Sequence, residues 1–296
     1  MPSFKHEVLK KSVNLLSMPM RWKLPPTNHL RAILETFTIF STLPWGVHRE
    51  KLQLGDFDAE FISPDVNVKK KVILYLHGGG YVIGSPHTHR GLAGKITKLS
   101  GIPSLLIDYR KAPENPFPYA LHDAYFAYQY LMNEKKFNAN DIFLIGDSAG
   151  GGLALSLQFK LKANNLPLPV ASVLLSPYVD LVNHDEDRLE NQNDRFMDIF
   201  EMRRWATLYA NTTELNDPYV SPLYGNLTGI SPLLIQASES EVLYDDTRRL
   251  VKKAREQGVD VTLQTWHGLI HWWHMFRGMP EAREATKKIA EFLSQY

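Results

Sequence analysis

Five residues in the middle of the chain have the types and spacing of a nucleophile turn. Gly146-Asp147-Ser148-Ala149-Gly150 fits G-x-S-x-G, follows the apolar run Ile142–Ile145 and precedes a helical pattern. A sharp strand-to-helix turn of this kind lifts the serine above the sheet, and glycines flank it because a Cβ atom would clash there. The N-terminus of the next helix offers N–H groups to developing negative charge. The pattern therefore predicts Ser148 as a nucleophile, with Asp147 supporting the turn.

A second glycine-rich turn follows another apolar run. His77-Gly78-Gly79-Gly80 comes directly after Val72–Leu76 and matches the HGGG type of oxyanion-hole loop. We expect the N–H groups of Gly79, Gly80 and Ala149 to stabilise a tetrahedral oxyanion. Because His77 adjoins the glycines, we interpret it as an organiser of the loop rather than a base.

The general base is expected after the last strand of the sheet. His267, His271 and His274 occur there, and we choose His271, which lies on the loop that enters the last helix. The spacing H-x3-H-x2-H is one that a metal site could use, but Gly268 and the lack of H-E-x-x-H nearby argue against one. We therefore expect no metal and no organic cofactor.

An acidic residue is needed to orient the imidazole and to stabilise the imidazolium ion. It is expected after the apolar run Leu233–Ala237, where Glu239, Glu241 and Asp245 are candidates. Each of them gives the chain order serine, acid, histidine that α/β-hydrolases use. The pattern alone leaves the three open.

Alternating elements must position these residues. Short apolar runs and helical patterns alternate from Val72 onward, which indicates an α/β fold with a mostly parallel sheet. An alternating polar stretch, 48–62, predicts a two-stranded hairpin. The other expected strands are 72–76, 104–107, 142–145, 170–175, 233–237 and 259–263, and the expected helices are 88–99, 119–134, 149–164, 245–257 and 280–294.

Two segments break the alternation, so we predict a core with a helical cap. Residues 1–45 read as cap helices, and 185–216 reads as an inserted helical piece, while 46–184 and 217–296 form the core. Ligand sites of open α/β sheets lie at the carboxyl ends of the strands. The cap is therefore expected to act as a lid over that edge.

Composition excludes several other classes of protein. The 296 residues include no cysteine, which removes disulfides, thiolate metal sites and cysteine nucleophiles. Lys plus Arg is 33 and Asp plus Glu is 32, a balance that argues against nucleic-acid binding. We found no secretory signal and no long apolar run, so we expect a cytoplasmic protein without membrane insertion.

Six motifs together resemble the hormone-sensitive-lipase-like family of α/β-hydrolases, which includes many bacterial carboxylesterases. They are HGGGYVIGS (77–85), DYRKAPENPFPYAL (108–121), GDSAGG (146–151), SPYVDL (176–181), SPLYG (221–225) and GLIH (268–271). The resemblance implies an eight-stranded sheet, Ser148 as nucleophile and His271 as base. It also implies a small ester substrate with a short or medium acyl chain.

The acid is where the chain departs from the family. The family usually has an aspartate in a D-P-L-x-D segment, with which Glu241-Val242-Leu243-Tyr244-Asp245 aligns. The resemblance therefore makes Glu241 the acid, because Leu243 and Asp245 then both match. Shifting the alignment by one residue would place Ser240 there and weaken the triad. Asp245 is expected to stabilise the start of the next helix.

Four aromatic residues are expected to line an apolar substrate pocket, with core or cap packing as the alternative: Tyr81, Trp272, Phe200 and Trp205. A lactone hydrolase or an amidase would use the same residues. A non-catalytic ligand-binding homologue is the alternative from another class, which the presence of both Ser148 and His271 disfavours. An exposed edge strand near the last helix is a candidate surface for a homodimer.

Overall fold

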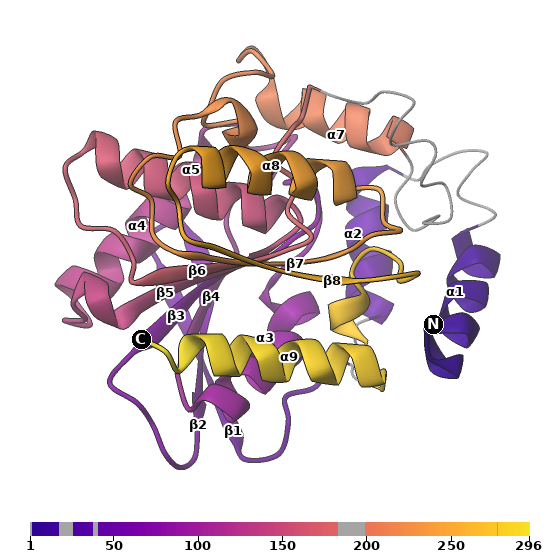
Figure 1. The fold of residues 1–296 in the computed structure, drawn as a ribbon, viewed down its shortest axis with the longest axis horizontal. Coiled ribbons are helices and arrows are strands. Elements are labelled where there is room, and N and C mark those ends of the chain that lie inside the picture. The colour runs from indigo at the N-terminus through magenta and orange to yellow at the C-terminus, as the bar shows by residue number, and fades with distance from the viewer. Residues whose placement is uncertain (1, 18–25, 38–40, 183–198, 277) are drawn as a thin grey trace.

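The structure, a computed structural model, describes residues 2–17, 26–37, 41–182, 199–276 and 278–296. Within these ranges eight strands form one sheet in the order β1-β2-β4-β3-β5-β6-β7-β8. Figure 1 shows the sheet crossing the middle of the molecule, with helices on both sides. The mostly parallel eight-stranded sheet expected from the sequence is confirmed.

Among the strands of the described residues, only β1 and β2 depart from the parallel arrangement. β2 pairs antiparallel with both β1 and β4, and the remaining neighbours pair parallel. The strands are β1 (Val47–Leu54), β2 (Phe57–Pro64), β3 (Val72–Leu76), β4 (Ser104–Ile107), β5 (Ile142–Asp147), β6 (Ala171–Leu175), β7 (Leu233–Ser238) and β8 (Val261–Trp266). The hairpin and the buried runs therefore lie where the pattern predicts them.

Helices cover both faces of the sheet. They are α1 (Phe4–Ser17), α2 (Thr27–Phe37), α3 (Pro86–Ser100), α4 (Tyr119–Asn133), α5 (Ala149–Ala163), α7 (Ile199–Ala210), α8 (Tyr244–Glu256) and α9 (Pro280–Leu293). In Figure 1, α3 and α9 lie below the sheet, while α4, α5 and α8 lie above it. Helix α7 lies above α8, toward the carboxyl ends of the central strands, and α1 stands at the right of the view.

Alternate residues of the central strands fill two separate cores. On β3, Val72, Leu74 and Leu76 pack into the core that includes α4 and α5. Ile73 and Tyr75 point to the opposite face and pack with α3 and α9. Since successive side chains of a strand alternate between faces, a strand covered on both sides must be apolar throughout. This is why the central strands read as continuous apolar runs.

Two boundaries differ from the sequence prediction for local reasons. The last strand was expected at 259–263, but Val259 closes the turn after α8, its N–H bonding to the carbonyl of Ala254 at 2.9 Å. That prediction was wrong because β8 is a half-exposed edge strand without an apolar run. Helix α3 begins before the expected residue 88, because Ser85 and Thr88 form a capping box with Pro86 at the first turn.

The cap prediction falls partly on described residues. Helices α1 and α2 belong to the segment 1–45, and α7 belongs to the insertion 185–216. Residues 183–198 lie outside the described residues, as does the side chain of Phe200. That the segments 1–45 and 185–216 form a cap, separate from the core and acting as a lid, stays a prediction. None of the helices in the described ranges has both the length and the apolarity to cross a lipid bilayer.

Candidate active site

Ser148 occupies a strained turn between β5 and α5. Its φ of 52° and ψ of −122° lie outside the regions that side-chain-bearing residues prefer. The turn is held by the neighbouring strand, since the Ser148 N–H bonds to the carbonyl of Leu175 at 2.8 Å. A Cβ atom on Gly146 would overlap the backbone of Gly150, and one on Gly150 would overlap the carbonyl of Leu76. The flanking glycines are therefore a packing requirement of the turn.

Glu241 and His271 meet at the same edge of the sheet. Nδ1 of His271 lies 3.2 Å from Oε2 of Glu241, and both side chains are fully buried. Glu241 follows β7 and His271 follows β8, so the carboxyl ends of neighbouring parallel strands bring them together. A buried carboxylate facing Nδ1 leaves Nε2 to act as the base.

The competing candidates lie elsewhere. His267 is 78% exposed and pairs with Glu239, itself 42% exposed, with 3.5 Å between Nδ1 and Oε2. Glu239 also accepts a hydrogen bond from Thr265 at 2.8 Å. Asp245 is the start of a charge pattern on α8, where it pairs with Arg248 and Arg249. The structure thus singles out Glu241 and His271 by burial and contact.

The oxyanion loop after β3 needs its glycines for conformation and for space. Gly79 and Gly80 have φ values of 118° and 59°, where residues with a Cβ atom are strained. A Cβ atom on Gly80 would overlap the ring of Trp205, which α7 places directly against the loop. The carbonyl of Gly79 accepts hydrogen bonds from Val82 and Ile83 at 3.0 and 2.9 Å. The loop is consequently a tight turn rather than a flexible linker.

Replacing Gly80 with alanine tests this loop. We expect kcat/KM for p-nitrophenyl butyrate to fall by about 10²-fold, because the added methyl group displaces either Trp205 or the oxyanion N–H groups. Gly229→Ala is the matched control, since its φ of 70° imposes the same strain where nothing lies within 4 Å. Equal activity of the two variants would contradict a role for Gly80 in the site.

Asp147 braces the nucleophile turn against the oxyanion loop. It accepts hydrogen bonds from the Tyr75 hydroxyl at 3.0 Å and from the Gly78 N–H at 3.2 Å. Nε2 of His89 lies 3.2 Å from its other oxygen. Burial alone would raise the pKa of Asp147, but His89 and the hydrogen bond from Tyr75 bring that pKa below its usual value. Asp147 therefore stays ionised and joins the nucleophile turn to the oxyanion loop by hydrogen bonds.

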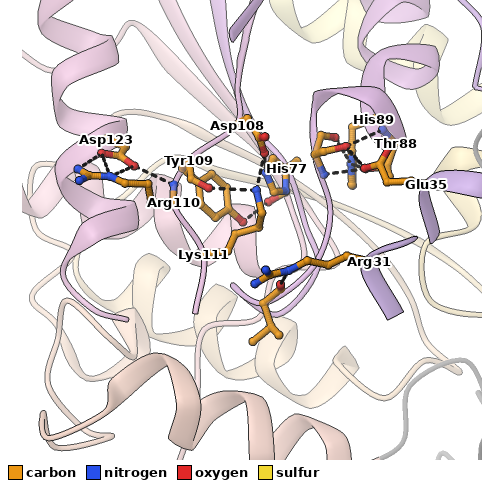
Figure 2. A network of polar contacts seen from close by, with 12 residues as sticks. Arg31, Glu35, His77, Thr88, His89, Asp108, Tyr109, Arg110, Lys111 and Asp123 are labelled. Atoms are coloured by element: carbon orange, nitrogen blue, oxygen red, sulfur yellow. Dashed lines mark hydrogen bonds and ion pairs between the residues drawn. The ribbon is translucent and has the colours of Figure 1, made fainter. Parts of the chain in front are cut away.

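His77 organises the loop as a neutral ring. Its ring stacks on Tyr109, with centroids 4.1 Å apart, and Figure 2 shows Lys111 and Asp108 beside the pair. Burial, with the positive charge of Lys111, lowers the pKa of His77 well below its ordinary value. Nδ1 lies 2.8 Å from the carbonyl of Gly78, which only accepts, so Nδ1 carries the proton. His77 therefore holds the glycine turn in place as a neutral ring, and this role requires no change of its protonation state.

Helix α2 is attached to the same loop from outside. Arg31 donates from Nε to the carbonyl of Val82 at 2.8 Å and from Nη2 to that of Ala112 at 2.6 Å. Its guanidinium also pairs with both oxygens of Glu114. Figure 2 shows Arg31 reaching toward the loop, with Glu35 of the same helix near His89 and Thr88. This clamp was not visible in the sequence, because its partners are separated by more than 50 residues.

Helix α1 reaches the loop that carries the predicted base. His6 is fully buried, and its Nε2 accepts a hydrogen bond from the Ile270 N–H at 3.1 Å. Ser3 anchors the same end of the helix by hydrogen bonds to Glu281 on α9. Burial lowers the pKa of His6, which keeps its ring neutral and able to accept. The N-terminal helices therefore hold both the oxyanion loop and the histidine loop.

Replacing His6 with alanine should lower kcat by roughly three- to tenfold, because the Ile270 N–H then loses its buried acceptor. His29→Ala, an exposed histidine on α2, is the control that should leave kcat unchanged. The pKa of His6 in the folded protein lies below the ordinary 6.5, so protonation of its ring favours the undocked state of α1. The docking of α1 should therefore weaken as the pH falls below that value, which amide hydrogen exchange would measure. Wild-type kcat in His6→Ala would show that the contact has no catalytic role.

The predicted pocket residues fall around this site. Tyr81 stacks on Tyr209 of the cap helix α7, with ring centroids 3.7 Å apart. Trp205 lies on Gly80, and Nε1 of Trp272 lies 3.0 Å from where a Cβ atom on Gly78 would stand. The rings of His271 and Trp272 lie 6.1 Å apart. Tyr81, Trp205 and Trp272 thus gather at the two catalytic loops, and a contact with substrate stays a prediction for each.

Comparison with known proteins decides the family. An α/β-hydrolase-fold family model matches residues 73–275. A solved esterase of the bacterial hormone-sensitive lipase family is 35% identical with a TM-score of 0.92, covering 100% of this chain and 99% of that one. The chain belongs to the hormone-sensitive-lipase-like family of α/β-hydrolases.

Two further relatives fix the class of reaction. An acetyl-hydrolase from Streptomyces hygroscopicus is 38% identical over 242 residues, which are 81% of this chain and 80% of the relative. The esterase EstE5, in a crystal soaked with p-nitrophenyl butyrate, is 34% identical with a TM-score of 0.93, covering 99% of this chain and 98% of that one. This hydrolase-family chain is a carboxylic ester hydrolase.

Proposed function

We propose that the chain hydrolyses short- to medium-chain carboxylic esters through an acyl intermediate on Ser148. The observation that carries the proposal is the buried contact between Glu241 and His271, at the sheet edge where the strained turn presents Ser148. A carboxylate–imidazole pair at the same sheet edge as a serine on a strand-to-helix turn is the arrangement that activates a hydroxyl for acyl transfer.

Each residue has one task in the proposed cycle. Ser148 Oγ attacks the acyl carbon while Nε2 of His271 takes its proton, and Glu241 stabilises the imidazolium that forms. The N–H groups of Gly79, Gly80 and Ala149 hold the oxyanion. His271 then gives the proton to the leaving alcohol, and water releases the acid from the acyl-serine by the same steps. No cofactor enters this cycle.

The acyl chain is proposed to be short or medium. Trp205 and Tyr81 narrow the approach to the oxyanion loop, since the first covers Gly80 and the second packs between Tyr209 and Gly152. The acetyl and butyryl groups in the names of the two relatives support the same range. Lactones and amides remain the alternative substrates, because the same residues would cleave them.

A p-nitrophenyl ester series from acetate to palmitate tests the proposal, with Ser148→Ala assayed in parallel. We expect turnover that depends on Ser148 and is highest for the short chains. A maximum at palmitate would contradict the proposed substrate class. Faster turnover of a lactone or an anilide than of every ester would instead favour the corresponding alternative.

The ligand, partners, location and oligomeric state are proposed from the sequence. We propose a small ester as the ligand, with no nucleic-acid partner and no membrane insertion, in the cytoplasm. A homodimer would pair through β8, the edge strand beside α9. Sedimentation velocity would test that state.

A further inference from the structure

We infer that Ser176 is a positioning residue for the catalytic acid, acting through a hydrogen bond from its hydroxyl to Glu241. Ser176 is the first residue after β6, and its Oγ donates to Oε2 of Glu241 at 2.9 Å. Both side chains are buried, with 2% of Ser176 and none of Glu241 exposed. The inference rests on the proposed role of Glu241 and extends it to a residue from another strand.

The hydroxyl is one of three donors around a fully buried carboxylate. Oε1 of Glu241 accepts from the Ser238 N–H at 3.2 Å, while Oε2 faces both Ser176 and Nδ1 of His271. A buried carboxylate must accept several hydrogen bonds to remain ionised. Glutamate has one more rotatable bond than aspartate, so it needs more contacts to hold one orientation. Ser176 fixes the oxygen that faces the base.

The backbone at Ser176 is itself constrained for this task. Its φ of 47° is strained for a residue with a side chain, and its N–H bonds to the carbonyl of Gln236 on β7 at 2.7 Å. Two residues on, the Tyr178 N–H bonds to the carbonyl of Ser148 at 2.9 Å. Leu175, just before it, accepts from the Ser148 N–H. The segment 175–178 therefore links the nucleophile turn to the acid, and the hydroxyl of Ser176 makes the last connection.

The test is steady-state kinetics of Ser176→Ala and Ser176→Gly on p-nitrophenyl butyrate across pH. Both variants lose the hydroxyl, and glycine adopts the positive φ without strain, so it keeps the fold even where alanine does not. We expect kcat to fall about tenfold in both with KM little changed, since a hydrogen bond to a charged group is lost. Thermal unfolding confirms the fold of each variant.

The pH profile separates positioning from packing. The Ser176 hydroxyl stabilises the Glu241 carboxylate most when His271 is neutral. Without that hydroxyl, the carboxylate stabilises the protonated His271 more strongly. The acid limb of the kcat profile should therefore move to higher pH by about half a unit. Among the described residues, Asp147 and His274 also interact electrostatically with His271, and both variants leave them in place.

Ser172→Ala is the matched control, because Ser172 is a fully buried, hydrogen-bonded serine near the start of β6, the strand that Ser176 follows. It should keep both kcat and the pH profile. Wild-type kcat and an unmoved acid limb in Ser176→Gly, with Glu241→Gln impaired, would overturn this inference alone. Full activity of Glu241→Gln would reject the acid and this inference together. Equal losses in the Ser172 and Ser176 variants without a pH shift would show packing only and overturn it.

Discussion

Ser148→Ala is expected to lower kcat for p-nitrophenyl butyrate by about 10⁴- to 10⁶-fold, leaving only the stabilisation that binding and the oxyanion loop provide. The reason is chemical: alanine at position 148 has no oxygen to form the acyl bond, so water must attack the ester directly. KM should change little, because the oxyanion N–H groups and the aromatic walls remain.

The control for that variant is its fold. Ser148 is buried and strained, with a φ of 52°, so alanine keeps the same backbone strain and removes only the hydroxyl. Circular dichroism and the unfolding temperature should match those of the wild type. Turnover within tenfold of wild type in such a folded variant would show that another group is the nucleophile.

Glu241→Gln should reduce kcat by about 10³- to 10⁴-fold. The glutamine amide fits the same space, but its NH₂ group can donate to Nδ1 of His271 and shift the ring proton to Nε2. An imidazole protonated on Nε2 cannot accept the proton of Ser148. The variant would also lose the negative charge that stabilises the imidazolium ion.

Glu239→Gln is the matched control two residues away. Glu239 is 42% exposed and pairs with the exposed His267, so we expect less than a twofold change in kcat. The reverse order of effects would move the acid to Glu239 and the base to His267. Glu241→Asp should fall between the two, because it keeps the charge but shortens the reach to His271.

The fold was accessible from the sequence because its signals are local. The central strands are apolar on both faces, as β3 shows, and G-x-S-x-G stands directly between a strand and a helix. The pair of Glu241 and His271 was predicted by resemblance, and the residues alone left three acids open. Burial and contact favour Glu241, since Glu239 is exposed, Asp245 pairs with Arg248 and Arg249, and Glu241 is fully buried beside His271.

The supporting contacts were missed because they join distant parts of the chain. Ser176 belongs to the motif SPYVDL, but the motif does not indicate that the serine hydroxyl faces Glu241, 65 residues away. His6 reaches Ile270 and Arg31 reaches Val82 in the same way. Among the described side chains of α1, the apolar Phe4 and Val8 are exposed, whereas the polar His6 is fully buried. Helical periodicity does not reveal such polar contacts.

Covalent trapping tests the central claim most directly. Phenylmethanesulfonyl fluoride should add one sulfonyl group to each enzyme molecule, and peptide mass spectrometry should locate that group on Ser148. Ester hydrolysis should be lost in step with labelling, while Ser148→Ala takes up no label and Glu241→Gln takes it up far more slowly. Complete labelling at another residue, or full hydrolysis by enzyme labelled on Ser148, would contradict the acyl-serine mechanism.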